Sequence, residues 1–64
     1  MKRKVLLAYL RDNGCVFVRE GARHSVFFNP ASQKSSTVPR HNEIHNDLAK
    51  KICKDLGITP ISRK

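Results

Sequence analysis

The chain has 64 residues, which leaves room for a single domain spanning 1–64. A chain this short buries roughly 60% of the surface that its unfolded form exposes, so its stability is marginal. Its 13 Lys and Arg against 5 Asp and Glu give a net charge of +8. That excess attracts polyanions through counterion release, which indicates a polyanionic partner and says nothing of the fold.

The N-terminus carries basic residues followed by a short apolar run, Val5-Leu6-Leu7-Ala8. Arg11 and Asp12 break this run, so it is too short for the core of a signal peptide or for a membrane span. We therefore expect a cytoplasmic protein with no membrane partner. The cysteines, Cys15 and Cys53, form no metal-binding spacing and are expected to be reduced core residues. No cofactor is predicted.

The first elements are a helix and two strands. Val5, Leu6, Tyr9 and Leu10 have helical spacing, and Asn13-Gly14 favours a helix end, so a helix is predicted over 3–12. Residues 15–20 and 25–29 are rich in β-branched and aromatic residues and predict two strands joined by a turn at 21–23. Strict alternation would place Arg19 on the face of Cys15 and Phe17, and Glu20 on the face of Val16 and Val18.

The second half of the chain predicts a third strand and a closing helix. Residues 35–38 favour a short strand that Pro39 ends, and 40–45 are polar and irregular. A helix is expected over 46–56, where an apolar stripe recurs every four residues and Gly57 resembles a C-cap. The stripe consists of Ile44, Leu48, Ile52 and Leu56, with Ala49 and Cys53 beside it. Ser62-Arg63-Lys64 is expected to be a frayed basic tail.

The element order is therefore helix, strand, strand, strand, helix. This order favours an α+β two-layer sandwich in which two helices cover one face of a three-stranded antiparallel sheet. The other face is left to solvent or to a ligand. Phe27 and Phe28 are consecutive in a strand, so they point to opposite faces, one into the core and the other towards a base or a protein partner.

Three segments together resemble a known family. The run Arg19-Glu20-Gly21-Ala22-Arg23-His24-Ser25-Val26-Phe27 looks like the hairpin of the HicA toxins of HicA–HicB toxin–antitoxin systems. Thr37-Val38-Pro39-Arg40-His41 resembles the Val-Pro-x-His segment of that family, and 48–58 resembles its closing helix. The resemblance extends over about 3–58 without a gap.

The resemblance implies a fold like that of double-stranded RNA-binding domains and metal-independent cleavage of messenger RNA by one essential histidine. It also implies inhibition by a HicB-like antitoxin. His24 occupies the position of the essential histidine. Many HicA proteins carry Gly-Ser before this histidine, whereas this chain has Ala22-Arg23. Glycine has no side chain and lets a ligand come close to the backbone, whereas the Cβ of Ala22 leaves a ligand less room.

The chemistry of His24 fits this expectation. An imidazole can take or give a proton near neutral pH, and flanking arginines can hold phosphate oxygens. The candidate RNA contacts are basic residues spread along the chain: Arg19, Arg23, Lys34, Arg40, His41, Lys50 and Lys51. No metal site is predicted from the three histidines, and His45 is assigned no role.

Three hypotheses remain open at this point. The first is a ribonuclease toxin acting through His24. The second is a non-catalytic RNA-binding module of the double-stranded RNA-binding type, although Asp47 puts an acid near the second helix start, where such modules need a base. The third is a subunit that lost activity through the Ala22-Arg23 change and only engages its antitoxin.

Overall fold

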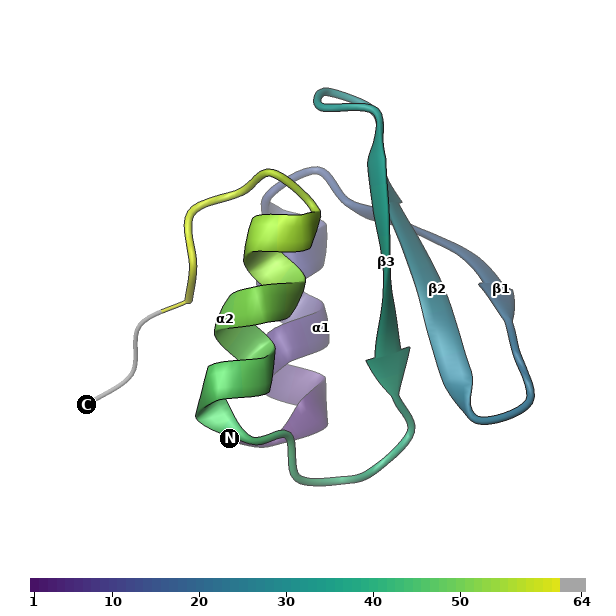
Figure 1. The fold of residues 1–64 in the computed structure, drawn as a ribbon, viewed down its shortest axis with the longest axis vertical. Helices are drawn as coiled ribbons and strands as arrows, with labels where there is room; N and C mark the ends of the chain where they lie inside the picture. Colours follow the sequence, from purple (N-terminus) through teal and green to yellow (C-terminus); the bar gives the residue numbers. More distant parts are fainter. Residues whose placement is uncertain (62–64) are drawn as a thin grey trace.

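A computed structural model describes residues 1–61 of the chain. The elements are α1 (Arg3–Asp12), β1 (Val16–Glu20), β2 (His24–Asn29), β3 (Lys34–Pro39) and α2 (Asn46–Asp55). The strands form one antiparallel sheet in the order β1-β2-β3, with both helices on the same side (Figure 1). The predicted α+β architecture is confirmed. The predicted frayed tail, 62–64, lies outside the described residues.

The core lies between the helices and the inner face of the sheet. Leu6 and Leu10 of α1 are fully buried, as the helical spacing predicts. Phe27 is 1% exposed, whereas Phe28 lies on the opposite, outer face, so the predicted split of these two residues is confirmed. The other buried apolar residues come mainly from β3, α2 and its flanks: Cys15, Val38, Ile44, Ala49, Ile52, Cys53, Leu56 and Ile61.

The predicted stripe of α2 is correct only in part. Ile44, Ile52 and Leu56 are buried as predicted, and Leu48, at 36% exposed, is the exception. The buried side of the helix consists of Ala49, Ile52 and Cys53, and Leu56 at the C-cap extends it. A spacing of three and four residues defines this side, and Leu48 lies at its margin.

A β-bulge interrupts the pairing of β1 with β2. Phe17 pairs with Phe27, but the next partners are Arg19 and Val26, so Val18 is an extra residue on β1. Such a bulge shifts the alternation of side chains by one residue. The side chains that follow Val18 therefore point to the faces opposite to those that strict alternation predicts.

The bulge corrects two predicted positions. Glu20 pairs with the buried Ser25 and so lies on the inner face, not with Val16. Arg19 pairs with Val26 and lies on the outer face, not with Phe17. The sequence offers no glycine to mark the bulge at Val18.

Glycines end both helices as predicted. Gly14 follows α1 with φ +86°, and Gly57 follows α2 with φ +74°, a left-handed conformation that L side chains rarely adopt. The amide of Ile58 donates to the carbonyl of Cys53 at 3.0 Å, which closes the end of α2. Both cysteines are free and buried, in agreement with the prediction of reduced core thiols.

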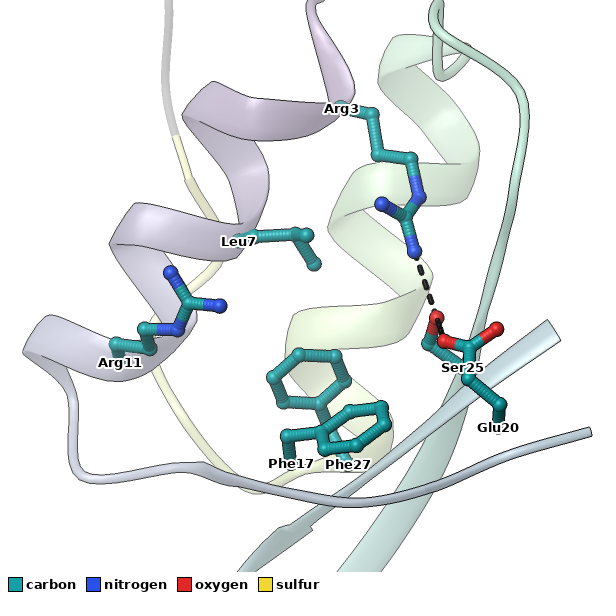
Figure 2. A pocket seen from close by; sticks show the side chains of 7 residues that line it. All are labelled: Arg3, Leu7, Arg11, Phe17, Glu20, Ser25 and Phe27. Carbon is teal, nitrogen blue, oxygen red and sulfur yellow. Dashed lines mark hydrogen bonds between the residues drawn. The ribbon is translucent and has the colours of Figure 1, made fainter.

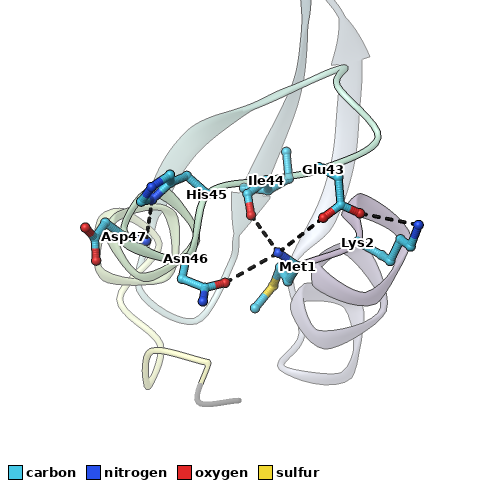
Figure 3. Close-up of polar contacts among 7 residues, drawn as sticks. All are labelled: Met1, Lys2, Glu43, Ile44, His45, Asn46 and Asp47. Carbon is cyan, nitrogen blue, oxygen red and sulfur yellow. Dashed lines mark hydrogen bonds and ion pairs between the residues drawn. The ribbon is translucent and has the colours of Figure 1, made fainter. Parts of the chain in front are cut away.

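The start of α1 is tied to the segment that precedes α2 (Figure 3). The N-terminal ammonium group donates to the Ile44 carbonyl at 2.9 Å, and the amide of Ile44 donates to the Met1 carbonyl at 2.8 Å. Glu43 forms an ion pair with Lys2 at 3.4 Å. His45 caps α2, because its Nδ1 accepts from the amide of Asp47 at 3.4 Å. These contacts fix the irregular 40–45 segment against α1.

Within residues 1–61, neither helix has the length and apolar character that crossing a bilayer requires.

Candidate functional site

His24 is the first residue of β2 and is exposed. It pairs with Pro39, the last residue of β3, and its side chain lies on the outer face with Val26 and Phe28. The amide of Gly21 donates to the His24 carbonyl at 2.7 Å and closes the turn from β1. Antiparallel pairing therefore brings the end of β1, the start of β2 and the end of β3 to one corner of the sheet.

Basic side chains gather at this corner. Arg23, Arg40 and His41 line an open depression of about 450 Å³ together with Ala22. Arg23 directly precedes His24 in the chain, and Arg40 directly follows Pro39, the β3 residue that pairs with His24. Arg19 lies on the same outer face as His24, one row along the hairpin. Four of the predicted RNA-binding residues thus lie at the same corner of the sheet as the predicted catalytic histidine.

The three predicted lysine contacts lie elsewhere. Lys34 pairs with Asn29 at the far end of β2, five residues from His24, which is about 17 Å along a strand. Lys50 and Lys51 are exposed on α2, in the helical layer behind the sheet. The ammonium group of Lys51 also forms an ion pair with Asp55 at 3.1 Å. These lysines add to the general charge of the molecule and do not belong to the His24 corner.

A chain of polar contacts supports this corner from the inner side (Figure 2). Arg3 of α1 donates from Nε to the Pro39 carbonyl at 2.8 Å and from Nη2 to Ser25 Oγ at 2.7 Å. Ser25 donates in turn to Glu20 Oε1, and Glu20 Oε2 lies 3.3 Å from Arg40 Nε. The contacts link the ends of all three strands to α1.

Sequence reasoning did not single out Arg3, Ser25 or Glu20 for this role. A polar residue in an otherwise apolar stretch of β2 is the signal that was available, because buried hydroxyls are nearly always hydrogen-bonded. Ser25 is 1% exposed. The bulge at Val18 is what turns Glu20 towards it, and this could not be seen in the sequence.

The arrangement can perform acid–base chemistry next to a bound anion. An exposed imidazole on a fixed strand end is accessible to a ligand, and guanidinium groups provide charge-assisted donors for its oxygens. Glu20 points to the inner face and forms its ion pair with Arg40 there, so it leaves the His24 side chain on the outer face uncovered.

Fold and site together define a small basic α+β domain with an exposed histidine at one corner of an open sheet. A family model described as the HicA toxin of bacterial toxin–antitoxin systems matches residues 3–58. The chain belongs to the HicA toxin family, and its role is that of a toxin with an antitoxin partner. Comparisons with curated proteins and with solved structures gave no match.

Proposed function

We propose that this toxin is a metal-independent endoribonuclease that cleaves messenger RNA with His24. The observation that carries the proposal is the exposed His24 at a corner of the sheet that also holds Arg19, Arg23 and Arg40, in a chain of the HicA family. The glycine-to-alanine change at Ala22 is compatible with it, since Gly21 makes the close turn: a Cβ there would lie 3.3 Å from the His24 carbonyl.

RNA supplies its own nucleophile, so side chains are sufficient for the reaction. A base removes the proton of the 2′-hydroxyl, O2′ forms a bond to phosphorus, and the bond from phosphorus to O5′ breaks. O5′ then takes a proton from an acid, which leaves a cyclic phosphate on one product. His24 performs one of these two proton transfers, and the arginines stabilise the charge that develops on the phosphate oxygens.

The experiment compares wild-type protein with His24→Ala and His45→Asn, in cells under tight expression control and on a defined messenger RNA in EDTA. His45→Asn is a matched control, because it removes an exposed imidazole but keeps an acceptor for the Asp47 amide. We expect growth arrest and cleavage with wild type and His45→Asn. His24→Ala should lower the cleavage rate about 10²–10⁴-fold while its urea denaturation midpoint stays unchanged.

Two results would contradict the proposal. Cleavage by His24→Ala at the wild-type rate would remove His24 from the chemistry. Intact RNA with every protein, together with salt-sensitive binding by all of them, would favour a non-catalytic RNA-binding module or an inactive toxin. If only His24→Ala fails to cleave, a pH–rate profile of the wild type assigns His24 as base or acid.

We also propose that the antitoxin is a HicB-like protein that covers the outer face of the sheet. Val16 on this face is 46% exposed and pairs with Phe28, and Val26 on the same face lies between Phe28 and His24 along β2. Val16→Asp should weaken capture by the cognate antitoxin at least tenfold. Leu48→Asp, an equal change at an exposed apolar residue of α2, should leave capture unchanged. Equal effects of the two changes would rule out the outer face.

A further inference from the structure

A groove runs between α1 and the edge strand β1 (Figure 2). It lies on the inner side of the sheet, whereas the side chain of His24 lies on the outer face. Its volume is about 250 Å³. Arg3, Leu7 and Arg11 form one wall, because residues four apart share a side of a helix. The floor and the other wall are made by the inner faces of β1 and β2. No predicted site residue lies in this groove.

An aromatic ring lies open in the groove. Phe17 is 49% exposed, while its partner Phe27 is buried, and the two rings meet edge to face with centroids 5.8 Å apart at 72°. The contact with Phe27 fixes the Phe17 ring while half of its surface stays free. A held, exposed ring is a stacking platform for a planar group, because every nucleobase has a π face that an aromatic side chain can cover.

The two ends of the groove differ in the state of their polar groups. At one end, Arg3, Ser25 and Glu20 are hydrogen-bonded to one another or to the sheet. At the other end, Arg11 is exposed, and its side chain makes no hydrogen bond or ion pair with any of residues 1–61. The free binding capacity of the groove is therefore an aromatic ring and a guanidinium group that line the same groove.

We propose that this groove binds one nucleotide of single-stranded RNA, with the base stacked on Phe17 and its phosphate held by Arg11. The RNA is the substrate assigned under the proposed function, and in that respect the inference rests on it. A planar base with an attached anion matches an aromatic ring beside a cation, and the net charge of +8 favours such a ligand over most peptides.

The position of the groove fits a strand of RNA that also reaches His24. Phe27, which pairs with Phe17, lies three residues from His24 along β2, about 10 Å. β1 is the outermost strand on this side of the sheet, so among the described residues no further strand separates the groove from the outer face. A strand of RNA can therefore pass over the edge of β1 from the groove to the His24 corner.

The first test measures the affinity of labelled single-stranded RNA in a His24→Ala background, which keeps the ligand intact. Phe17→Leu should weaken binding about tenfold. Arg11→Gln should also weaken it and reduce the slope of log Kd against log salt by about 0.7, the value for one phosphate contact to a single strand. Tyr9→Leu and Lys54→Gln are the matched controls, since they remove a ring and a charge outside the groove, and they should change the affinity less than twofold.

The second test uses the absence of tryptophan from the sequence. Phe17→Trp introduces a single indole at the proposed platform, and a stacked base should quench its emission on titration with RNA while the affinity is retained. Tyr9→Trp, outside the groove, should show no quenching. Unchanged affinity in Phe17→Leu together with unchanged emission in Phe17→Trp would overturn the inference. So would a Phe17→Leu protein that loses binding to the antitoxin but keeps its affinity for RNA.

The two proposals can fail separately in these tests. Wild-type protein that never cleaves RNA but binds it through Phe17 would refute the ribonuclease alone. Wild-type protein that cleaves RNA, with Phe17→Leu binding and cleaving equally well, would refute the groove alone.

Discussion

The sheet has a covered part and an uncovered part, although all three strands are of similar length. β2 and β3 lie under the helices, where Phe27 is 1% exposed and Val38 is fully buried. β1 lies beyond them, and all five of its residues are exposed. The hydrophobic core is therefore built from β2, β3 and the helices, and both faces of β1 remain accessible to a ligand or a partner.

An exposed apolar edge strand carries a risk of pairing with other chains. Val18 is 52% exposed and forms the bulge, and Arg19 follows it. A bulge and a charge are two of the devices by which proteins keep an edge strand from adding further strands. β1 can thus remain uncovered for a ligand or partner without acting as a template for aggregation.

The first prediction compares the loss of stability when phenylalanine is replaced by alanine in the covered part and in the uncovered part of the sheet. Phe27→Ala should lower the free energy of unfolding by about 3–5 kcal/mol, because it empties the centre of the core. Phe17→Ala should cost about 1 kcal/mol, since half of the ring is already in solvent. Urea denaturation measures both.

A loss of 3–5 kcal/mol is comparable to the whole stability of a chain this short. If Phe27→Ala is unfolded without urea, the pair Phe27→Leu and Phe17→Leu makes the same comparison with smaller losses. Equal losses at the two positions would show that β1 is as much a part of the core as β2.

The second prediction concerns how α2 is held over the covered part. A Cβ on Gly57 would lie 2.9 Å from Ser32 Cβ, in the turn between β2 and β3, and φ there is +74°. Gly57→Ala should therefore cost about 2 kcal/mol. Gly14→Ala is the control: φ is +86°, but nothing lies within 4 Å of the added carbon. It should cost about 1 kcal/mol, and thermal unfolding that gives equal losses would exclude the contact with Ser32.

The third prediction concerns the polar link between the two parts. Ser25→Ala removes the hydroxyl that joins Arg3 to Glu20 and should cost about 1 kcal/mol. Ser35→Ala, at an exposed serine of β3, should change stability by less than about 0.5 kcal/mol. Hydrogen exchange should become faster at the amides of 20–25 in Ser25→Ala. Protection that stays at the wild-type level would mean that this link does not stabilise the hairpin.

The smallest expected effect is a dependence of stability on alkaline pH. Burial raises the pKa of the Cys15 thiol, with a further contribution from the charge of Cys53, and burial raises the pKa of Cys53 although a hydrogen bond from the Ile61 backbone opposes it. The unfolded chain therefore releases these protons first as pH rises, so stability is retained below the ordinary pKa of a thiol and falls above it. Urea midpoints between pH 7 and 9.5 should decline in wild type and decline less in Cys15→Ala/Cys53→Ala. Parallel declines in both proteins would assign the effect to other groups.

Much of the fold follows from local sequence patterns. The bounds of α1 are those predicted, since the apolar spacing and Asn13-Gly14 mark both its period and its end. The strands agree to within about one residue, with His24 and Pro39 included in β2 and β3. The antiparallel order alone then brings His24 and Arg40 to one corner, so the centre of the candidate site could be predicted.

The remaining features depend on tertiary packing and not on local pattern. No residue type marks the bulge at Val18, so the predicted faces of Arg19 and Glu20 were wrong. The spacing of α1 predicts which side it buries but not which strands it covers, so the exposure of Phe17 could not be foreseen. The distance of Lys34 from His24 follows from the strand register, and the number of basic residues in the sequence gives no information about register.

The extra residue in β1 has a consequence for how the length of the hairpin can vary. Deleting Val18 would give regular pairing, with Arg19 still opposite Val26 and Glu20 still opposite Ser25, so both side chains would keep their faces. The acidic group would stay against Arg3 and the basic group on the His24 side, so the charge of each surface would be kept. The sorting depends on the partners of these two residues in β2, so it tolerates both substitution and loss of Val18. We therefore expect that related hairpins vary at this position in residue number as well as in residue type.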